Sequence, residues 1–218
     1  MSDQMNFSTL SLGLPAVTVA VFAALALLSV LALTVTIFKI LQFRRIGVGK
    51  GRLADQVLDD WLNGRPDEAM RKAGQGDGVL PRVLQAVMSG LRARPNDPDY
   101  AEELGRQSAL VELSSMAARM RLLESVVQAA PMLGLLGTVI GMIDAFSALS
   151  QSTGAIDPAQ LAGGIWTALT TTAIGLAIAL VTYFVANWLE SRIDAERQDI
   201  EMAISAAIHG RVAGGGRR

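Results

Sequence analysis

The groups of this sequence that can do chemistry in an apolar setting are a few hydroxyl and carboxyl side chains. Four threonines fall within residues 167–175, and another follows two glycines in residues 131–143. Polar side chains in apolar segments usually face a helix interface or a wet path rather than lipid. A hydroxyl can order water and relay a proton, whereas a carboxyl can hold a charge. The candidate lining residues are Thr138, Asp144, Thr167, Thr171 and Thr172.

Each of these residues also has a purely structural reading. A threonine can bond to a carbonyl of its own helix, and Asp144 can be a solvated residue at a helix end. Four hydroxyls in one half of a segment favour the lining role. Pro131 removes a backbone hydrogen bond, so it predicts either a packing kink or a hinge.

Small residues accompany the hydroxyls. Gly137 and Gly141 are four positions apart and therefore share a helix face that another helix can approach closely. Gly134 lies one turn before them, and Gly175 follows the threonines of the later segment. We predict that these glycines form the packing surface between two helices.

The segments that carry these residues are long enough to cross a membrane. Charged residues are 18% of the 218 residues, and three runs hold none: 4–38, 125–143 and 158–189. A spanning helix needs about 20 apolar residues, and a buried helix of a soluble protein rarely stays uncharged for so long. The predicted division is an outer tail at 1–13, spans at 14–38, 126–149 and 163–189, a cytoplasmic helical domain at 39–125, an outer loop at 150–162, and a cytoplasmic helix and tail at 190–218.

Basic residues predict the orientation of these spans. Every Lys and Arg lies within residues 39–121 or 192–218. Cytoplasmic loops carry the excess of positive charge, so the amino terminus is expected outside the cytoplasm and the carboxyl terminus inside it. The first apolar run is longer than a signal-peptide core and lacks a basic start, so we interpret it as an uncleaved anchor.

The remaining segments read as helices, which predicts an all-α fold. A helix is expected from Pro66 to near Gly74, another over residues 80–91, and a third that Asp97 or Asp99 caps. From Tyr100 the pattern continues without a stop signal, which predicts one long helix that enters the second span. The third span is likewise expected to continue inward on isoleucines at helical spacing.

Two motifs resemble the ExbB/TolQ/MotA proton-channel family. Residues 131–146, with the core Gly-Leu-Leu-Gly-Thr-Val-Ile-Gly-Met, are similar to the second span of those proteins, and residues 164–176 are similar to the third. The three-span plan with a large cytoplasmic loop resembles ExbB and TolQ more than MotA. The resemblance implies polar lining at Thr138 and Thr172. At Thr167, where several ExbB proteins carry a glutamate, this chain is neutral.

The same resemblance implies an assembly. Members of the family form a ring, commonly a pentamer, around a single-span partner of the ExbD/TolR type in the bacterial inner membrane. The complex uses inward proton flow to drive work at the outer membrane, in some cases through a TonB- or TolA-like protein. Because the spans hold no mid-membrane carboxyl, the titrating acid is expected from the partner helix.

Other classes of function fit the sequence less well. There is no cysteine, one histidine near the carboxyl end, and no paired carboxylates in a recognisable arrangement, so an enzyme is not expected. No metal, cofactor or nucleic-acid partner is predicted. The alternative to a proton-driven motor is a membrane scaffold that forms a ring and recruits proteins without conducting ions.

Overall fold

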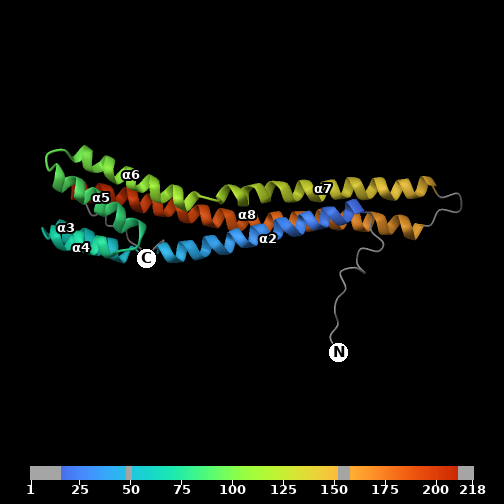
Figure 1. The fold of residues 1–218 in the computed structure, drawn as a ribbon, viewed down its shortest axis with the longest axis horizontal. Helices are drawn as coiled ribbons and strands as arrows, with labels where there is room; N and C mark the ends of the chain where they lie inside the picture. The colour runs from blue at the N-terminus through green and yellow to red at the C-terminus, as the bar shows by residue number, and fades with distance from the viewer. Residues whose placement is uncertain (1–15, 48–50, 152–157, 211–218) are drawn as a thin grey trace, which may run out of the picture. The chain divides into compact units, whose positions relative to one another are not determined.

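The structure, a computed structural model, describes residues 16–47, 51–151 and 158–210 of the chain. All regular structure within these ranges is helical: α2 (Ala16–Ile46), α3 (Arg52–Leu62), α4 (Pro66–Gln75), α5 (Val79–Ala93), α6 (Pro98–Ala117), α7 (Met120–Gln151) and α8 (Pro158–His209) (Figure 1). The predicted tail at 1–13 lies outside the described residues, as do the middle of the predicted outer loop and the last eight residues.

Three long helices are apolar enough to cross a membrane, as the charge-free runs predict. They are α2, the stretch Pro98–Ser147 that holds α6 and most of α7, and α8 from Leu161 onward. Length and composition alone support this assignment, which confirms the all-α class and the presence of three candidate spans.

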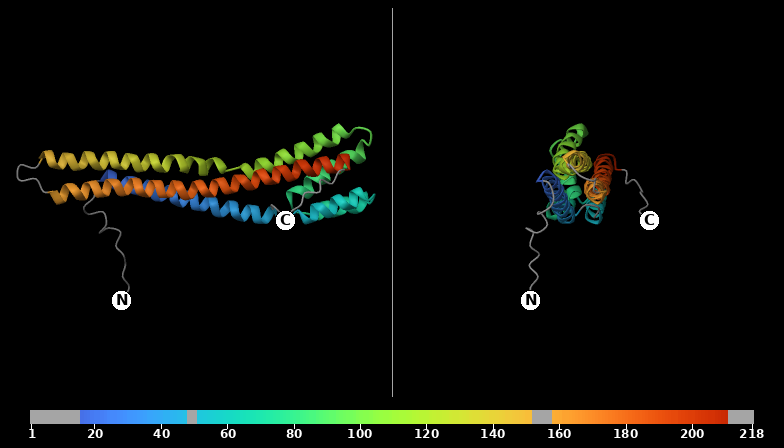
Figure 2. Two further views of the ribbon diagram at one scale, coloured as in Figure 1. Left: turned by 180° about the vertical axis from the view of Figure 1, so that it is seen from behind. Right: turned by 90° about the vertical axis from the view of Figure 1, so that its right-hand side faces the viewer.

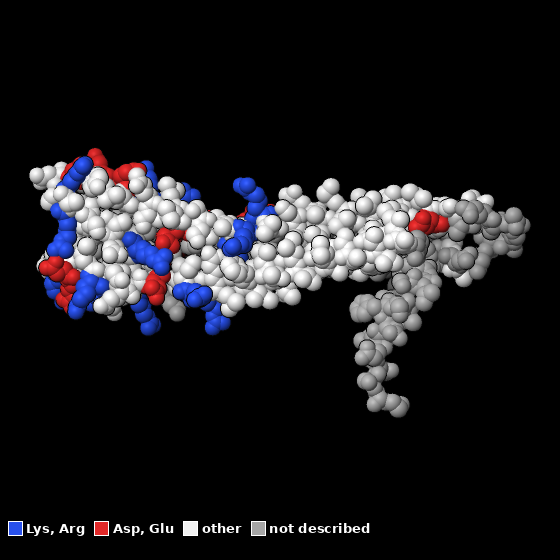
Figure 3. All heavy atoms as spheres, in the orientation of Figure 1, with Lys and Arg blue, Asp and Glu red and all other residues white. Residues whose placement is uncertain are grey.

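The described helices divide into two compact units. We call residues 1–36 and 119–186 the apolar unit, and residues 37–118 and 187–218 the charged unit. On the face shown in Figure 3, most of the blue and red atoms of ionisable side chains lie over the charged unit, and a red group lies over the apolar unit. Helices α2 and α8 each contribute residues to both units.

The apolar unit is built from α7, α8 as far as Ala186 and α2 as far as Thr36. Val21 and Leu25 of α2 form a buried cluster with Ala130 of α7 and Ala179 of α8. Partly buried apolar side chains from all three helices surround this cluster: Leu28, Leu133, Ile140 and Ile178. Figure 2 shows the three helices running alongside one another.

The core of the charged unit forms where α5 crosses α6. A Cβ added at Gly90 would lie 2.7 Å from the Cα of Ala101, so the backbones meet at a distance that only glycine permits. Gly105 of α6 makes room for the side chain of Val87, and the side chain of Ile204 lies in ordinary contact beside it. Asp97 caps α6 by accepting a hydrogen bond from the backbone N–H of Tyr100 at 3.2 Å, which confirms that prediction.

A buried carboxylate joins α3 to α4. Asp60 is only 3% exposed and pairs with Lys72 at 2.5 Å and Arg65 at 2.7 Å. The hydrogen bond from Lys72 holds the pKa of Asp60 below its usual 3.8, against the opposing effect of burial. The apolar spacing of Leu53, Val57 and Trp61 would have predicted α3, a helix that the sequence reading did not assign.

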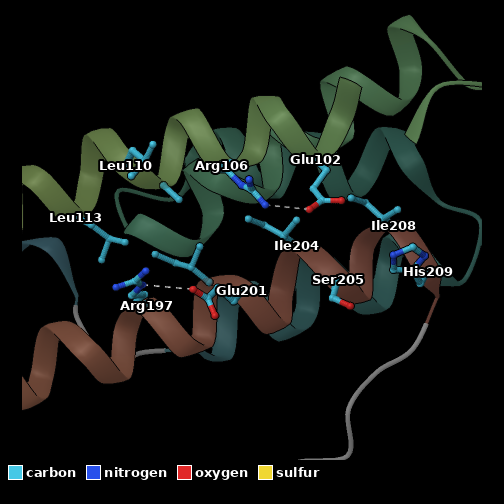
Figure 4. Close-up of a pocket in the computed structure, with 12 residues that line it drawn as sticks. Glu102, Arg106, Leu110, Leu113, Arg197, Glu201, Ile204, Ser205, Ile208 and His209 are labelled. Atoms are coloured by element: carbon cyan, nitrogen blue, oxygen red, sulfur yellow. Dashed lines mark hydrogen bonds and ion pairs between the residues drawn. The ribbon is translucent and has the colours of Figure 1, made fainter. Parts of the chain in front are cut away.

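A groove of about 630 Å³ lies between α6 and the last turns of α8 (Figure 4). Its rim carries two ion pairs, Arg106 with Glu102 at 3.4 Å and Arg197 with Glu201 at 3.3 Å. Each pair joins residues four apart on one helix, so neither of these pairs links the two sides of the groove.

The expectation of one unbroken helix from Tyr100 into the second span is wrong. Helix α6 ends at Ala117 and α7 begins at Met120. Arg119 between them has φ 67°, a left-handed conformation that an α-helix does not contain. By contrast, α8 continues without a break to His209, as expected, and its Ile200 and Ile204 are buried.

Candidate functional site in the apolar unit

Helices α7 and α8 pack through glycines that leave no room for a side chain. A Cβ at Gly137 would lie 2.5 Å from Oγ1 of Thr171, and one at Gly141 would lie 2.8 Å from Cβ of Ala168. A Cβ at Gly175 would lie 2.5 Å from the carbonyl oxygen of Ala130. The two backbones therefore approach closely along an antiparallel seam, as small-residue faces allow in membranes.

Two threonines of α8 converge on one carbonyl of α7. The hydroxyl of Thr172 donates to the carbonyl oxygen of Gly134 at 2.8 Å. The hydroxyl of Thr171 lies 3.2 Å from the same oxygen and 2.6 Å from the carbonyl oxygen of Ala168 in its own helix. Thr171 is fully buried, so its hydroxyl belongs to the helix seam. Thr172 is half-buried and lies at the margin of the seam.

Helical rotation shows which residues share an edge of the α7–α8 pair. An α-helix turns by about 100° per residue. We call rotation in the direction of the following residue forward. Thr138 is rotated forward by about 70° from the glycine face of α7. Thr172 is rotated forward by a similar angle from the face of α8 that contains Ala168 and Gly175. Because the helices run antiparallel, forward rotation on both leads to the same side. Thr138 and Thr172 therefore lie on one edge of the pair.

Asp144 and Thr167 lie on the opposite edge. Both are rotated backward from their packing faces, by about 50° and 70° respectively. Leu133 and Ile140 of α7 turn toward this same side, where they pack against the cluster that contains α2. Helix α2 thus packs on the side of the pair toward which Asp144 is rotated, and its cluster includes neither Thr138 nor Thr172.

A shallow groove runs along the side of α7 that carries Thr138. Its volume is about 690 Å³, and its lining is mainly apolar: Thr138, Val139, Met142, Ile143, Phe146, Ser147 and Ser150. The hydroxyl of Thr138 donates to the carbonyl oxygen of Leu135 at 2.6 Å. Its oxygen can still accept a hydrogen bond from a donor that enters the groove. Ile143 and Phe146 are more than half exposed.

Asp144 has an unusual environment for a carboxylate. Its Oδ2 atom is buried and has no hydrogen-bond partner among the described residues. An unpaired buried polar atom is costly, and in an apolar segment it marks a functional candidate. Thr167, on the same edge, donates to the carbonyl oxygen of Gly163 at 3.0 Å. This bond to its own helix is the structural role that the sequence offered as an alternative to lining.

The structure therefore separates the predicted site residues into three groups. Thr171 and the glycines at 134, 137, 141 and 175 form the helix seam. Thr138 and Thr172 share one edge, while Asp144 and Thr167 share the other. Pro131 lies inside α7, which continues through it. The sequence-based prediction did not include Gly164 and Ala168, which also pack against α7. Together with Thr171 and Gly175 they repeat every three or four residues, and this spacing could have identified them.

These features define a class: a multi-pass membrane protein whose last two spans form a glycine-packed, hydroxyl-bearing pair. Residues 75–202 match the MotA/TolQ/ExbB proton channel family. The match covers more than half of the chain, so the chain belongs to this family, and its relatives make it ExbB-type.

Individual relatives agree with this assignment. A protein described as a biopolymer transport ExbB homolog from Methanothermobacter thermautotrophicus is 34% identical over 166 residues, which is 75% of this chain and 57% of that relative. The biopolymer transport protein ExbB of Neisseria meningitidis is 28% identical over 90% of this chain and 92% of its own. The Tol-Pal system protein TolQ of Haemophilus influenzae is 40% identical over 88 residues. With three apolar helices, these likenesses make the chain a multi-pass inner-membrane protein.

Proposed function

We propose that this chain is the ring-forming subunit of an inner-membrane proton-channel motor. Several copies, expected to be five, surround the single span of an ExbD/TolR-like partner. Proton flow through the ring is coupled to energised transport or other work at the outer membrane. The relatives named for biopolymer transport and for the Tol-Pal system support this proposal.

One observation carries the proposal. Thr138 and Thr172 lie on one edge of the α7–α8 pair, and the buried cluster with α2 includes neither of them. In a ring, this edge would face the central space, while the bulky aliphatic surface of α2 would face lipid. Leu27, Leu33 and Ile37 of α2 are about half exposed or more, as expected for a lipid-facing helix.

The two hydroxyls would serve the proton carrier of the partner. Among the described residues 16–38, 125–151 and 158–189, Asp144 is the one residue with a carboxyl side chain. It lies on the opposite edge from Thr138 and Thr172. We therefore assign the titrating acid to the partner helix. Thr138 and Thr172 would bond that acid or its water, and Pro131 would act as a hinge that lets α7 follow the partner.

The membrane potential supplies enough free energy for such coupling. Moving one elementary charge across 100 mV releases about 2.3 kcal/mol. The expected orientation places the amino terminus in the periplasm and the carboxyl terminus in the cytoplasm, so the charged unit would lie on the cytoplasmic side. A TonB- or TolA-like protein would act on the periplasmic side of the membrane.

The test is proton flux in proteoliposomes that contain this chain with and without its single-span partner. Flux should require both proteins, and the double variant Thr138→Val/Thr172→Val should reduce it by at least tenfold. Valine keeps the size of threonine but removes the hydroxyl, so assembly should remain intact. Cross-linking and size-exclusion chromatography measure that assembly.

Thr170→Val is the matched control. Its hydroxyl donates to the carbonyl oxygen of Trp166 at 2.8 Å, and helical rotation places it away from the Thr172 edge. Flux should therefore be unchanged. Full flux in the double valine variant would refute the role of the hydroxyls. Assembly with the partner but no flux in the unmodified complex would favour the non-conducting scaffold.

A further inference from the structure

The end of α6 is held in a conformation that its own sequence does not favour. Ala118 donates its N–H to the carbonyl oxygen of Ser114 at 2.9 Å, and Arg119 then adopts φ 67°. Ala118 is itself extended, with φ −53° and ψ 138°, so the chain leaves the helix before it reaches the left-handed residue. Glycine usually occupies a left-handed position because side chains make that conformation costly. Here an arginine occupies it, and no proline or glycine lies between Gly105 and Pro131.

Two side chains from α2 bind carbonyls in the last turn of α6. Lys39 donates from Nζ to the carbonyl oxygen of Met116 at 2.5 Å. Gln42 donates from Nε2 to the carbonyl oxygen of Ser115 at 3.3 Å. In a continuous helix, the backbone N–H groups of Arg119 and Met120 would bond to these same two oxygens. The α2 side chains therefore bind the oxygens through which a continuous helix would carry on.

Burial and charge make Lys39 the stronger of the two groups. It is fully buried, and its ammonium group also bonds to Oε1 of Gln42 at 3.2 Å and lies 5.7 Å from the ring centre of Phe43. A cation at a helix C-terminus interacts favourably with the helix dipole, and a charge-assisted bond in a buried setting is among the strong ones. A lysine is rarely fully buried unless its charge is paired with polar groups.

We propose that Lys39 and Gln42 form a clamp that binds the carbonyl end of α6 and stabilises its last turn, so that loss of the clamp allows this end to open locally. The clamp sits on α2, which is one continuous helix from Ala16 to Ile46. A shift of α2 along or around its axis would therefore act directly on the C-terminus of α6. Lys39 and Gln42 are thus positioning residues for the α6–α7 junction, and their importance for conduction rests on the proposed function.

Hydrogen exchange tests the clamp without reference to conduction. Backbone amide exchange is measured by mass spectrometry on the 218-residue chain in nanodiscs, in peptides that cover residues 112–122. Lys39→Met keeps the length of the side chain but removes its charge and donors. Exchange in these peptides should rise at least tenfold, which corresponds to about 1.4 kcal/mol. Lys39→Arg should stay within threefold of the unmodified chain.

Arg44→Met is the matched control, because it removes one positive charge from an exposed position of the same helix. It should leave exchange in residues 112–122 unchanged. Exchange in Lys39→Met that stays equal to or below that of the unmodified chain would overturn the clamp. If Lys39→Met does not fold, Gln42→Leu replaces it, with an expected rise of about threefold, and no rise would overturn the clamp equally.

Proton flux tests the link to conduction. Lys39→Met should lower flux in proteoliposomes with the partner, and Lys39→Arg should restore at least half of it. Normal flux in Lys39→Met, together with faster exchange, would overturn the positioning role. Absence of flux from the unmodified complex would instead refute the proposed function, and the exchange experiment would still decide the clamp.

Discussion

The close approach of α7 to α8 at Gly137 gives the sharpest prediction. In Gly137→Ala, the new Cβ would lie 2.5 Å from Oγ1 of Thr171 and 2.8 Å from its Cβ. Ordinary van der Waals contact begins at 3.4 Å, so the helices would have to separate by about 0.9 Å at this point. The same separation would lengthen the 2.8 Å bond from Thr172 to the carbonyl of Gly134 beyond the usual hydrogen-bond range.

The expected cost follows from these two effects. Overpacking costs about 1–3 kcal/mol, and a hydrogen bond between membrane helices contributes about 0.6 kcal/mol on average. We expect Gly137→Ala to destabilise the helix pair by about 1–3 kcal/mol, a factor of roughly 5 to 150 in the unfolding equilibrium. Equilibrium unfolding by SDS in mixed micelles, followed by circular dichroism, measures this change.

Two further variants make the measurement specific. Gly163→Ala on α8 adds the same methyl group where nothing lies within 4 Å, so it should be neutral. Thr171→Ala removes Oγ1 and Cγ2 but keeps Cβ, so adding it to Gly137→Ala should recover part of the loss. A double-mutant cycle gives that coupling energy. Equal stability of Gly137→Ala and Gly163→Ala would refute the close seam, and a cycle with no coupling would refute its geometry.

Two other substitutions probe the charged unit and the helix α7. Asp60→Asn removes the carboxylate held by Lys72 and Arg65. Folding lowers the pKa of Asp60, so the carboxylate stabilises the fold above pH 3.8. This stabilisation disappears as the pH falls through the lowered pKa. Urea titrations of the solubilised chain from pH 3 to 7 should show a gap between the two proteins that closes below pH 3.8, and a gap constant in pH would contradict this assignment. Pro131→Ala restores the backbone donor that α7 lacks at that position, so it should stabilise α7. If Pro131 is a hinge, proton flux should fall in this variant despite the higher stability, whereas unchanged flux would leave it a packing kink.

Much of the membrane architecture follows from the sequence because its signals are local. A charge-free run of sufficient length predicts a spanning helix whatever it packs against, and α2, α7 and α8 follow that rule. The spacing of Gly134, Gly137 and Gly141 likewise predicts a packing face before any partner is known. The sequence does not say which hydroxyl enters the seam. Thr171 and Thr172 are adjacent in the chain, yet one is fully buried and the other lies at the margin.

The break between α6 and α7 shows where local signals fail. Residues 110–118 contain leucine, methionine and alanine, which favour a helix, and no helix breaker. The carbonyls at this stop accept hydrogen bonds from Lys39 and Gln42, which are more than seventy residues away in the chain. A basic residue at the end of an apolar helix is ordinarily explained by membrane orientation alone. Its complete burial, visible only in the fold, is what distinguishes Lys39 from Arg44 and Arg45 and gives it a second task.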